Sequence, residues 1–152
     1  MTKLYVSAKK NTDFANCNIV LNSNAIDTKT KKIRRISDEI IPIFSQASDA
    51  GYYFLLIARI PSKLPQGPGY CGAGYEDHMI LLEYNRKRIR LLDDFLLQSC
   101  LTAISLAGDK SDNFLESISV DRKNHLVNFR WLGNPDDDDH VLKISEGKLL
   151  IN

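Results

Sequence analysis

The stretch Gly51-Tyr52-Tyr53-Phe54-Leu55-Leu56-Ile57-Ala58-Arg59-Ile60 decides the fold class of this chain. Its residues are aromatic and aliphatic almost throughout, and Pro61 follows it directly. An apolar run of this length without polar alternation is typical of a strand that is buried on both faces. We therefore expect a β-strand over about residues 52–60 at the centre of the protein.

The segments around this stretch carry further strand patterns. Residues 78–84 are again mostly apolar, and a second run begins after a short polar break at 85–86, which predicts a hairpin. Farther along, Val127, Phe129 and Trp131 alternate with polar residues, which predicts a half-buried strand with these three side chains in the core. The chain closes on another hairpin pattern over residues 142–151, with its turn at Glu146-Gly147.

Two segments are compatible with short helices. Ser37-Asp38-Glu39 could cap a helix that runs to Gln46, although Pro42 would lie inside it and remove a hydrogen bond. Residues 93–107 have apolar side chains at helical spacing, but they fit a strand nearly as well. We expect a mainly β fold, an antiparallel sandwich or a strongly curved sheet, with at most two short helices.

Length and composition indicate one domain that spans residues 1–152. The chain has 152 residues, of which 43% are hydrophobic, and it carries 20 Lys and Arg against 19 Asp and Glu. A domain of this size can build a core without a structural metal. No apolar run approaches the roughly 20 residues of a membrane helix, and no secretory signal pattern follows the N-terminal lysines. We expect no membrane association and a cytoplasmic location.

The cysteines and histidines give no metal-site pattern. Cys17, Cys71 and Cys100 are far apart, and no histidine lies at ligand spacing from any of them. We expect three free thiols, no metal and no cofactor.

One loop invites a catalytic interpretation. Residues 67–72 match the G-x-G-x-x-G pattern of dinucleotide-binding loops, but a strand pattern follows where a helix N-terminus should hold the pyrophosphate. Within this loop Cys71 resembles a nucleophile, and His78 could activate it only if the loop folds back. A small enzyme or ligand-binding β domain that uses the Cys71 loop is therefore one candidate function.

The near-zero net charge hides an asymmetry along the chain. Residues 1–35 hold eight basic and two acidic residues, a balance of 8 − 2 = +6, whereas residues 91–152 hold six basic and eleven acidic ones, a balance of 6 − 11 = −5. The basic stretch at 29–35 could contact phosphates, but it lacks neighbouring aromatic residues for base stacking, and the acidic remainder would repel a polyanion. We therefore expect no nucleic-acid partner.

Several short segments carry a resemblance to a known class of protein. Residues 53–59, 69–77, 98–101, 128–131 and 147–149 together resemble small bacterial immunity proteins that accompany toxins of the contact-dependent growth inhibition type. The resemblance covers roughly residues 50–152, and the Cys-Gly-Ala-Gly-Tyr-Glu segment is its most specific part. It implies a cytoplasmic, non-catalytic protein that binds the C-terminal toxin domain of its cognate effector, commonly a nuclease, and blocks its active site.

The charge pattern suggests which residues would bind such a toxin. A nuclease presents a basic cleft to phosphates, so carboxylates on an inhibitor would imitate the substrate and accelerate encounter. Asp93 and Asp94 are neighbours in a strand and should point to opposite faces, which excludes them as an acid/base pair. For residues 136–139 the alternative is a solvated hairpin tip that contacts no partner. The candidate toxin-binding residues are Glu76, Asp77, Asp93, Asp94, Asp136, Asp137, Asp138 and Asp139.

Overall fold

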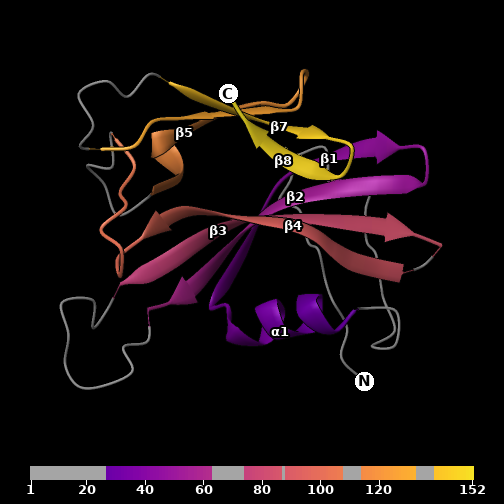
Figure 1. Cartoon of the computed structure of the whole chain (residues 1–152), viewed down its shortest axis with the longest axis horizontal. Coiled ribbons are helices and arrows are strands. Elements are labelled where there is room, and N and C mark those ends of the chain that lie inside the picture. The colour runs from indigo at the N-terminus through magenta and orange to yellow at the C-terminus, as the bar shows by residue number, and fades with distance from the viewer. Residues whose placement is uncertain (1–26, 63–73, 87, 108–113, 133–138) are drawn as a thin grey trace.

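The computed structural model describes residues 27–62, 74–86, 88–107, 114–132 and 139–152 (Figure 1). The elements in chain order are α1 (Thr28–Ile36), β1 (Glu39–Ser48), β2 (Gly51–Pro61), β3 (Tyr75–Asn85), β4 (Arg88–Ser99), the 3-10 helix η2 (Phe114–Ser117), β5 (Ile118–Asp121), β6 (Leu126–Phe129), β7 (His140–Ser145) and β8 (Lys148–Ile151).

The strands form two antiparallel sheets of four strands each. The first sheet has the order β1-β2-β3-β4 and the second has the order β5-β6-β7-β8, so each follows the chain as a meander. The second sheet lies over one face of the first, and α1 crosses the opposite face (Figure 1). The expected mainly β, antiparallel sandwich is confirmed.

The first sheet is buried on both faces, which explains its continuous apolar runs. In β2, Leu55 and Ile57 belong to the core between the two sheets, whereas Phe54, Leu56 and Ala58 pack in a second cluster on the face that α1 crosses. Successive side chains of a strand point to opposite faces, so a strand covered on both sides needs apolar residues at every position. The prediction of a doubly buried central strand over residues 52–60 is confirmed.

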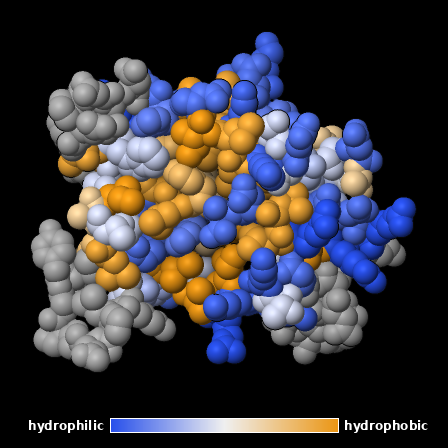
Figure 2. Space-filling view, viewed as in Figure 1, coloured by the Kyte–Doolittle hydropathy of each residue, from blue (hydrophilic) through white to orange (hydrophobic). Residues whose placement is uncertain are grey.

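The core between the sheets is filled by alternate residues of the second sheet. Val127 and Phe129 are buried there, as the alternation predicted. Trp131 is half-buried at the rim of this core, where its indole Nε1 donates a hydrogen bond to the carbonyl oxygen of Leu97 at 2.9 Å. Apolar atoms gather in the middle of the view in Figure 2, over β4 and β8, where the edges of the two sheets meet.

The helix α1 lies in the basic stretch at 29–35, where the sequence pattern did not predict a helix. Asp27 caps it, because its carboxylate accepts hydrogen bonds from the backbone N–H of Thr30 at 2.9 Å and from the Thr30 hydroxyl at 2.7 Å. The same residue joins the helix to β4, since its N–H donates to the Ile89 carbonyl at 3.0 Å and its Oδ2 accepts from the Leu91 N–H at 2.6 Å. Ile33 packs on the first sheet.

The possible helix over residues 37–46 is wrong, because this segment forms β1. Pro42 is acceptable there, since β1 is an edge strand whose register shifts next to it, between Pro42 and Phe44. The ambiguous segment at 93–107 continues β4 as far as Ser99. Its register against β3 shifts twice, which blurs a strict alternation and explains why the pattern suited both structures.

The expectation of three free thiols is wrong for Cys100, which is disulfide-bonded. Cys17 and Cys71 lie outside the described residues. Spacing along the chain carries no information about which cysteines meet in space, so the sequence could not predict this bond.

Candidate protein-binding surface

One end of the sandwich, where β3 begins and β4 ends, combines apolar and acidic side chains. We call this surface the loop end and define it by Tyr75, Glu76, Leu101, Leu132 and Asp139. Its segments are far apart in sequence and are joined through their backbones. The N–H of Leu101 donates to Glu76 Oε1 at 3.2 Å, and the N–H of Leu132 donates to the Ser105 carbonyl at 2.7 Å.

The loop end exposes large apolar side chains. Leu132 is 68% exposed and Leu101 is 45% exposed, and Tyr75 beside them is 37% exposed. Single exposed leucines are common on protein surfaces, whereas a group of them beside charged residues is typical of an interface.

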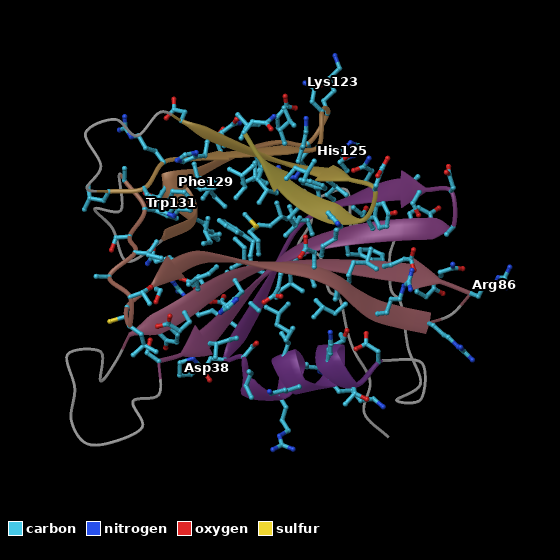
Figure 3. The ribbon with its side chains drawn as sticks, in the orientation of Figure 1. Asp38, Arg86, Lys123, His125, Phe129 and Trp131 are labelled. Carbon is cyan, nitrogen blue, oxygen red and sulfur yellow. The ribbon has the colours of Figure 1, made fainter. Side chains whose placement is uncertain are left out.

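An aromatic cluster supports the loop end from within. The Trp131 and His140 rings lie 4.7 Å apart, and Phe129 lies 5.1 Å from Trp131. Figure 3 labels Phe129 and Trp131, whose side chains lie at this end of the second sheet. Because Leu132 and Asp139 are the chain neighbours of Trp131 and His140, their backbones are held by packed rings.

Glu76 is used to build this end. Its carboxylate accepts hydrogen bonds from the Ser62 hydroxyl and from the Leu101 N–H. Partial burial raises the pKa of Glu76, but the hydrogen bonds from Ser62, Ser99 and the backbone at 100–101 outweigh this effect and hold the pKa below its usual value. Glu76 therefore fixes the loop at 100–103 and remains ionised at neutral pH.

Asp77 is buried and faces an arginine instead of a partner protein. Its side chain has no exposed area, and Arg59 Nε lies 3.0 Å from its Oδ1. Arg59 also lies over the ring of Tyr75, at 4.9 Å from the ring centroid. Burial raises the pKa of Asp77, and the hydrogen bond and charge of Arg59 oppose this rise only in part. Asp77 acts as an internal support below the loop end.

Asp93 and Asp94 point to opposite faces of the first sheet, as expected from their positions in a strand. Asp93 Oδ2 accepts a hydrogen bond from the Leu149 N–H at 2.8 Å, which connects β4 to β8. Asp94 is exposed and lies 3.6 Å from His78 Nδ1 on the face that α1 crosses. Neither aspartate belongs to the loop end.

The remaining candidates divide between described and undescribed residues. Asp139 is exposed at the loop end, whereas Asp136, Asp137 and Asp138 lie outside the described residues, as does Cys71 with its glycine-rich loop. Of the carboxylates predicted from sequence, the structure thus brings Glu76 and Asp139 to one surface. Sequence reasoning missed Leu101 and Leu132, although Leu132 directly follows Trp131 in an alternating pattern and this position could have indicated an outward side chain.

Metal and membrane signatures are absent from the described part of the chain. Within it, no three His, Cys, Asp or Glu side chains are grouped so that they could hold a metal ion. No helix in these same ranges is both long enough and apolar enough to cross a bilayer.

Comparisons with known proteins identify no relative, because no family model, no curated protein and no solved structure matches this chain.

Proposed function

We propose that this protein is an immunity protein, which binds and neutralises the C-terminal toxin domain of a contact-dependent growth inhibition system. The resemblance of its sequence segments to such proteins motivates the proposal. The toxin domain would be a nuclease, and the immunity protein would block its active site.

The observation that carries the proposal is the pair of exposed leucines at the loop end. Leu101 and Leu132 stand on neighbouring backbone segments that are fixed by hydrogen bonds and by the aromatic cluster. A rigid apolar centre with a charged rim is the usual composition of a binding surface, because the apolar atoms gain from dehydration and the rim charges guide encounter. Asp139 supplies a negative charge at this rim, which suits the basic cleft of a nuclease.

The proposal predicts that the gene immediately upstream encodes a large effector, and binding of this protein to the C-terminal domain of that effector tests it. Leu132→Asp and Leu101→Asp should each weaken the complex at least about tenfold, because each places a charge in the desolvated centre of the interface. Leu150→Asp is the matched control, since Leu150 is 41% exposed but lies on β8, away from the loop end. It should leave the affinity unchanged.

The acidic rim makes a separate kinetic prediction. Asp139→Asn should slow association and make it less dependent on salt, with little change in the dissociation rate, because exposed rim charges act mainly on encounter. Asp94→Asn removes an exposed aspartate from a different face and should change neither rate. If the upstream toxin domain fails to bind, or if it binds the Leu132 and Leu101 variants as tightly as the unmodified chain, the proposal is wrong.

The proposal includes a cytoplasmic location, and this location predicts that Cys100 is reduced in the cell. Cytoplasmic thiol systems keep protein cysteines reduced, whereas disulfides persist in oxidising compartments. A cytoplasmic protein should therefore carry Cys100 as a thiol in the cell, and trapping of thiols during lysis followed by mass spectrometry measures this. A disulfide at Cys100 in the cell would instead assign the protein to an oxidising compartment.

A further inference from the structure

A second surface, on the face of the first sheet that α1 crosses, is strongly basic. We call it the basic band and define it by its exposed basic residues, which come from α1 and from the turn between β3 and β4: Lys29, Lys31, Lys32, Arg35 and Arg86. The two segments are more than fifty residues apart in sequence, and the charge pattern along the chain indicated only the stretch at 29–35.

Hydrogen bonds from Asp27 bring these two segments together. Asp27 bonds to Ile89 and Leu91, so the start of α1 is fixed to β4 directly after Arg88. From there the helix runs under the first sheet, and Asp38 just beyond it bonds through its N–H to the Arg59 carbonyl at 2.9 Å. Figure 3 shows Arg86 extending from one end of the sheet and Asp38 at the other. The basic band thus follows α1, which is about 14 Å long, from its start beside the β3–β4 turn.

The acidic residues near this strip offset its positive charge only in part. Glu83 pairs with Arg90, whose Nε lies 2.6 Å from Glu83 Oε2, and for this reason Arg90 is not counted in the band. The Asp27 carboxylate is occupied by the helix cap and by Leu91. Helix α1 has no acidic residue of its own, but three exposed carboxylates lie near the band: Asp38 two residues beyond the helix, Asp49 in the β1–β2 turn, and Asp94 on the same face, 3.6 Å from His78 Nδ1.

The same face supplies aromatic side chains beside the hairpin. Tyr52 is 49% exposed and pairs across the sheet with Tyr84, which directly precedes the turn that carries Arg86. Tyr84 packs in the cluster on the face of α1, so Tyr52 and Tyr84 lie on the side of the basic band. The absence of neighbouring aromatic residues was one reason to expect no nucleic-acid partner, and this arrangement removes that reason.

We propose that the basic band binds single-stranded nucleic acid, with its lysines and arginines on the phosphates and Tyr52 stacked on a base. Proteins that bind single strands without sequence preference combine these two features. An anionic membrane is the less suitable ligand, because Ile36, 37% exposed, is the one apolar side chain that α1 exposes and Ile33 packs inward, so the helix lacks the wide apolar face of a membrane-surface helix. This activity is separate from toxin binding, since the loop end contributes no residue to it.

Fluorescence anisotropy of labelled oligothymidylate and oligouridylate with the full-length protein tests the proposal. We expect the affinity to fall steeply with salt. The double variant Lys32→Glu/Arg86→Glu, with one residue from α1 and one from the β3–β4 turn, should lower the slope of log affinity against log salt by about 1.4, because each lost phosphate contact on a single strand accounts for about 0.7. The matched control Arg122→Glu/Lys123→Glu makes the same charge change in the exposed turn between β5 and β6, and it should leave both affinity and slope nearly unchanged.

The aromatic part of the proposal has its own pair of variants. Tyr52→Ser should weaken binding about tenfold, whereas Tyr52→Phe keeps the ring and should bind like the unmodified chain. Leu132→Asp should not affect oligonucleotide binding, so failure of toxin binding and failure of this proposal are separable. The proposal is overturned if no oligonucleotide binds, if the Arg122→Glu/Lys123→Glu control weakens binding as much as the Lys32→Glu/Arg86→Glu variant, or if vesicles containing phosphatidylserine bind the band while oligonucleotides do not.

Discussion

The two sheets of this protein are built from the same kind of strand connection, yet they differ in length and in burial. The strands of the first sheet have 10 to 12 residues, and those of the second have four to six. The first sheet is covered by the second sheet on one face and by α1 on the other, whereas the second buries only its inner face. The longer strands are therefore apolar at consecutive positions, and the shorter ones alternate.

Because of this difference, a residue on the outer face of a sheet is in a different environment in each of the two sheets. On the first sheet, a residue beneath α1 that points away from the sandwich core, such as Leu82, is still in a core, because the helix covers that part of the face. On the second sheet, such a residue is at the surface. Matched substitutions on these two outer faces should therefore have opposite outcomes.

Leu82→Lys and Leu150→Lys test the comparison with the largest expected effect. Leu82 is 5% exposed in the cluster beneath α1, and Leu150 is 41% exposed on the second sheet. A lysine at position 82 would be a buried charge without a partner and should cost about 4 kcal/mol or more of unfolding free energy. The same change at position 150 should stay within about 0.5 kcal/mol. Urea denaturation of both variants measures this, and equal effects would contradict the proposed difference between the faces.

Arg59→Met tests the buried ion pair in the first sheet and should depend on pH. Loss of Arg59 leaves the buried Asp77 carboxylate unpaired, which should cost about 3 kcal/mol at pH 7. Burial already raises the folded-state pKa of Asp77 above the unfolded value, so its ionised form opposes folding at neutral pH. As pH falls through the folded-state pKa, Asp77 takes up a proton and the penalty of the variant should shrink.

The measurement for this variant is its difference in unfolding free energy from the unmodified chain at pH 7 and at pH 4.5. The difference isolates Asp77, because Asp27 and Glu76 have lowered pKa values in both proteins and lose their stabilising effect in acid alike. Arg122→Met, at an exposed turn, is the control and should leave stability unchanged. A penalty that stays constant with pH would show that Asp77 does not titrate in this range.

Asp27→Ala tests the attachment of α1 and should have the smallest effect of the three. It removes the helix cap and the acceptor for the Leu91 N–H, and should cost about 1–2 kcal/mol. Asp27→Asn retains a capping side chain and should lose less. Hydrogen exchange should show faster exchange at residues 28–36 in the alanine variant while the second sheet is unaffected. If residues 28–36 exchange equally slowly in the Asp27→Ala and Asp27→Asn variants, the packing of Ile33 alone holds the helix on the sheet.

The sequence predicted the parts of the fold in which one local pattern determines the outcome. The run at 52–60, the hairpin after residue 84 and the closing hairpin all follow from apolar pattern and turn residues. It did not predict α1, because in this helix only Thr30 is buried and only Ile33 packs its apolar side chain on the sheet. A short helix of this kind depends on tertiary contacts, here the bonds of Asp27 to β4 and the packing of Ile33, which no local pattern contains.

The candidate site was less predictable than the fold. Carboxylates were selected by charge, but Asp77 and Asp93 serve internal contacts, which depend on partners 18 and 56 residues away along the chain. The exposed leucines at the loop end depend on how separate loops meet. The aromatic neighbour of the basic band is equally non-local, since Tyr52 reaches it only through strand pairing.

The bonds that Asp27 makes to β4 also bear on self-association. An edge strand offers unpaired N–H and C=O groups to which another copy of the chain can add a strand. Asp27 occupies two of these groups on β4, at Ile89 and Leu91, so it closes that part of the edge to a second copy. Asp27 therefore caps α1 and also prevents another copy of the chain from pairing with this part of β4. The Asp27→Ala variant should form oligomers at concentrations where the unmodified chain remains monomeric.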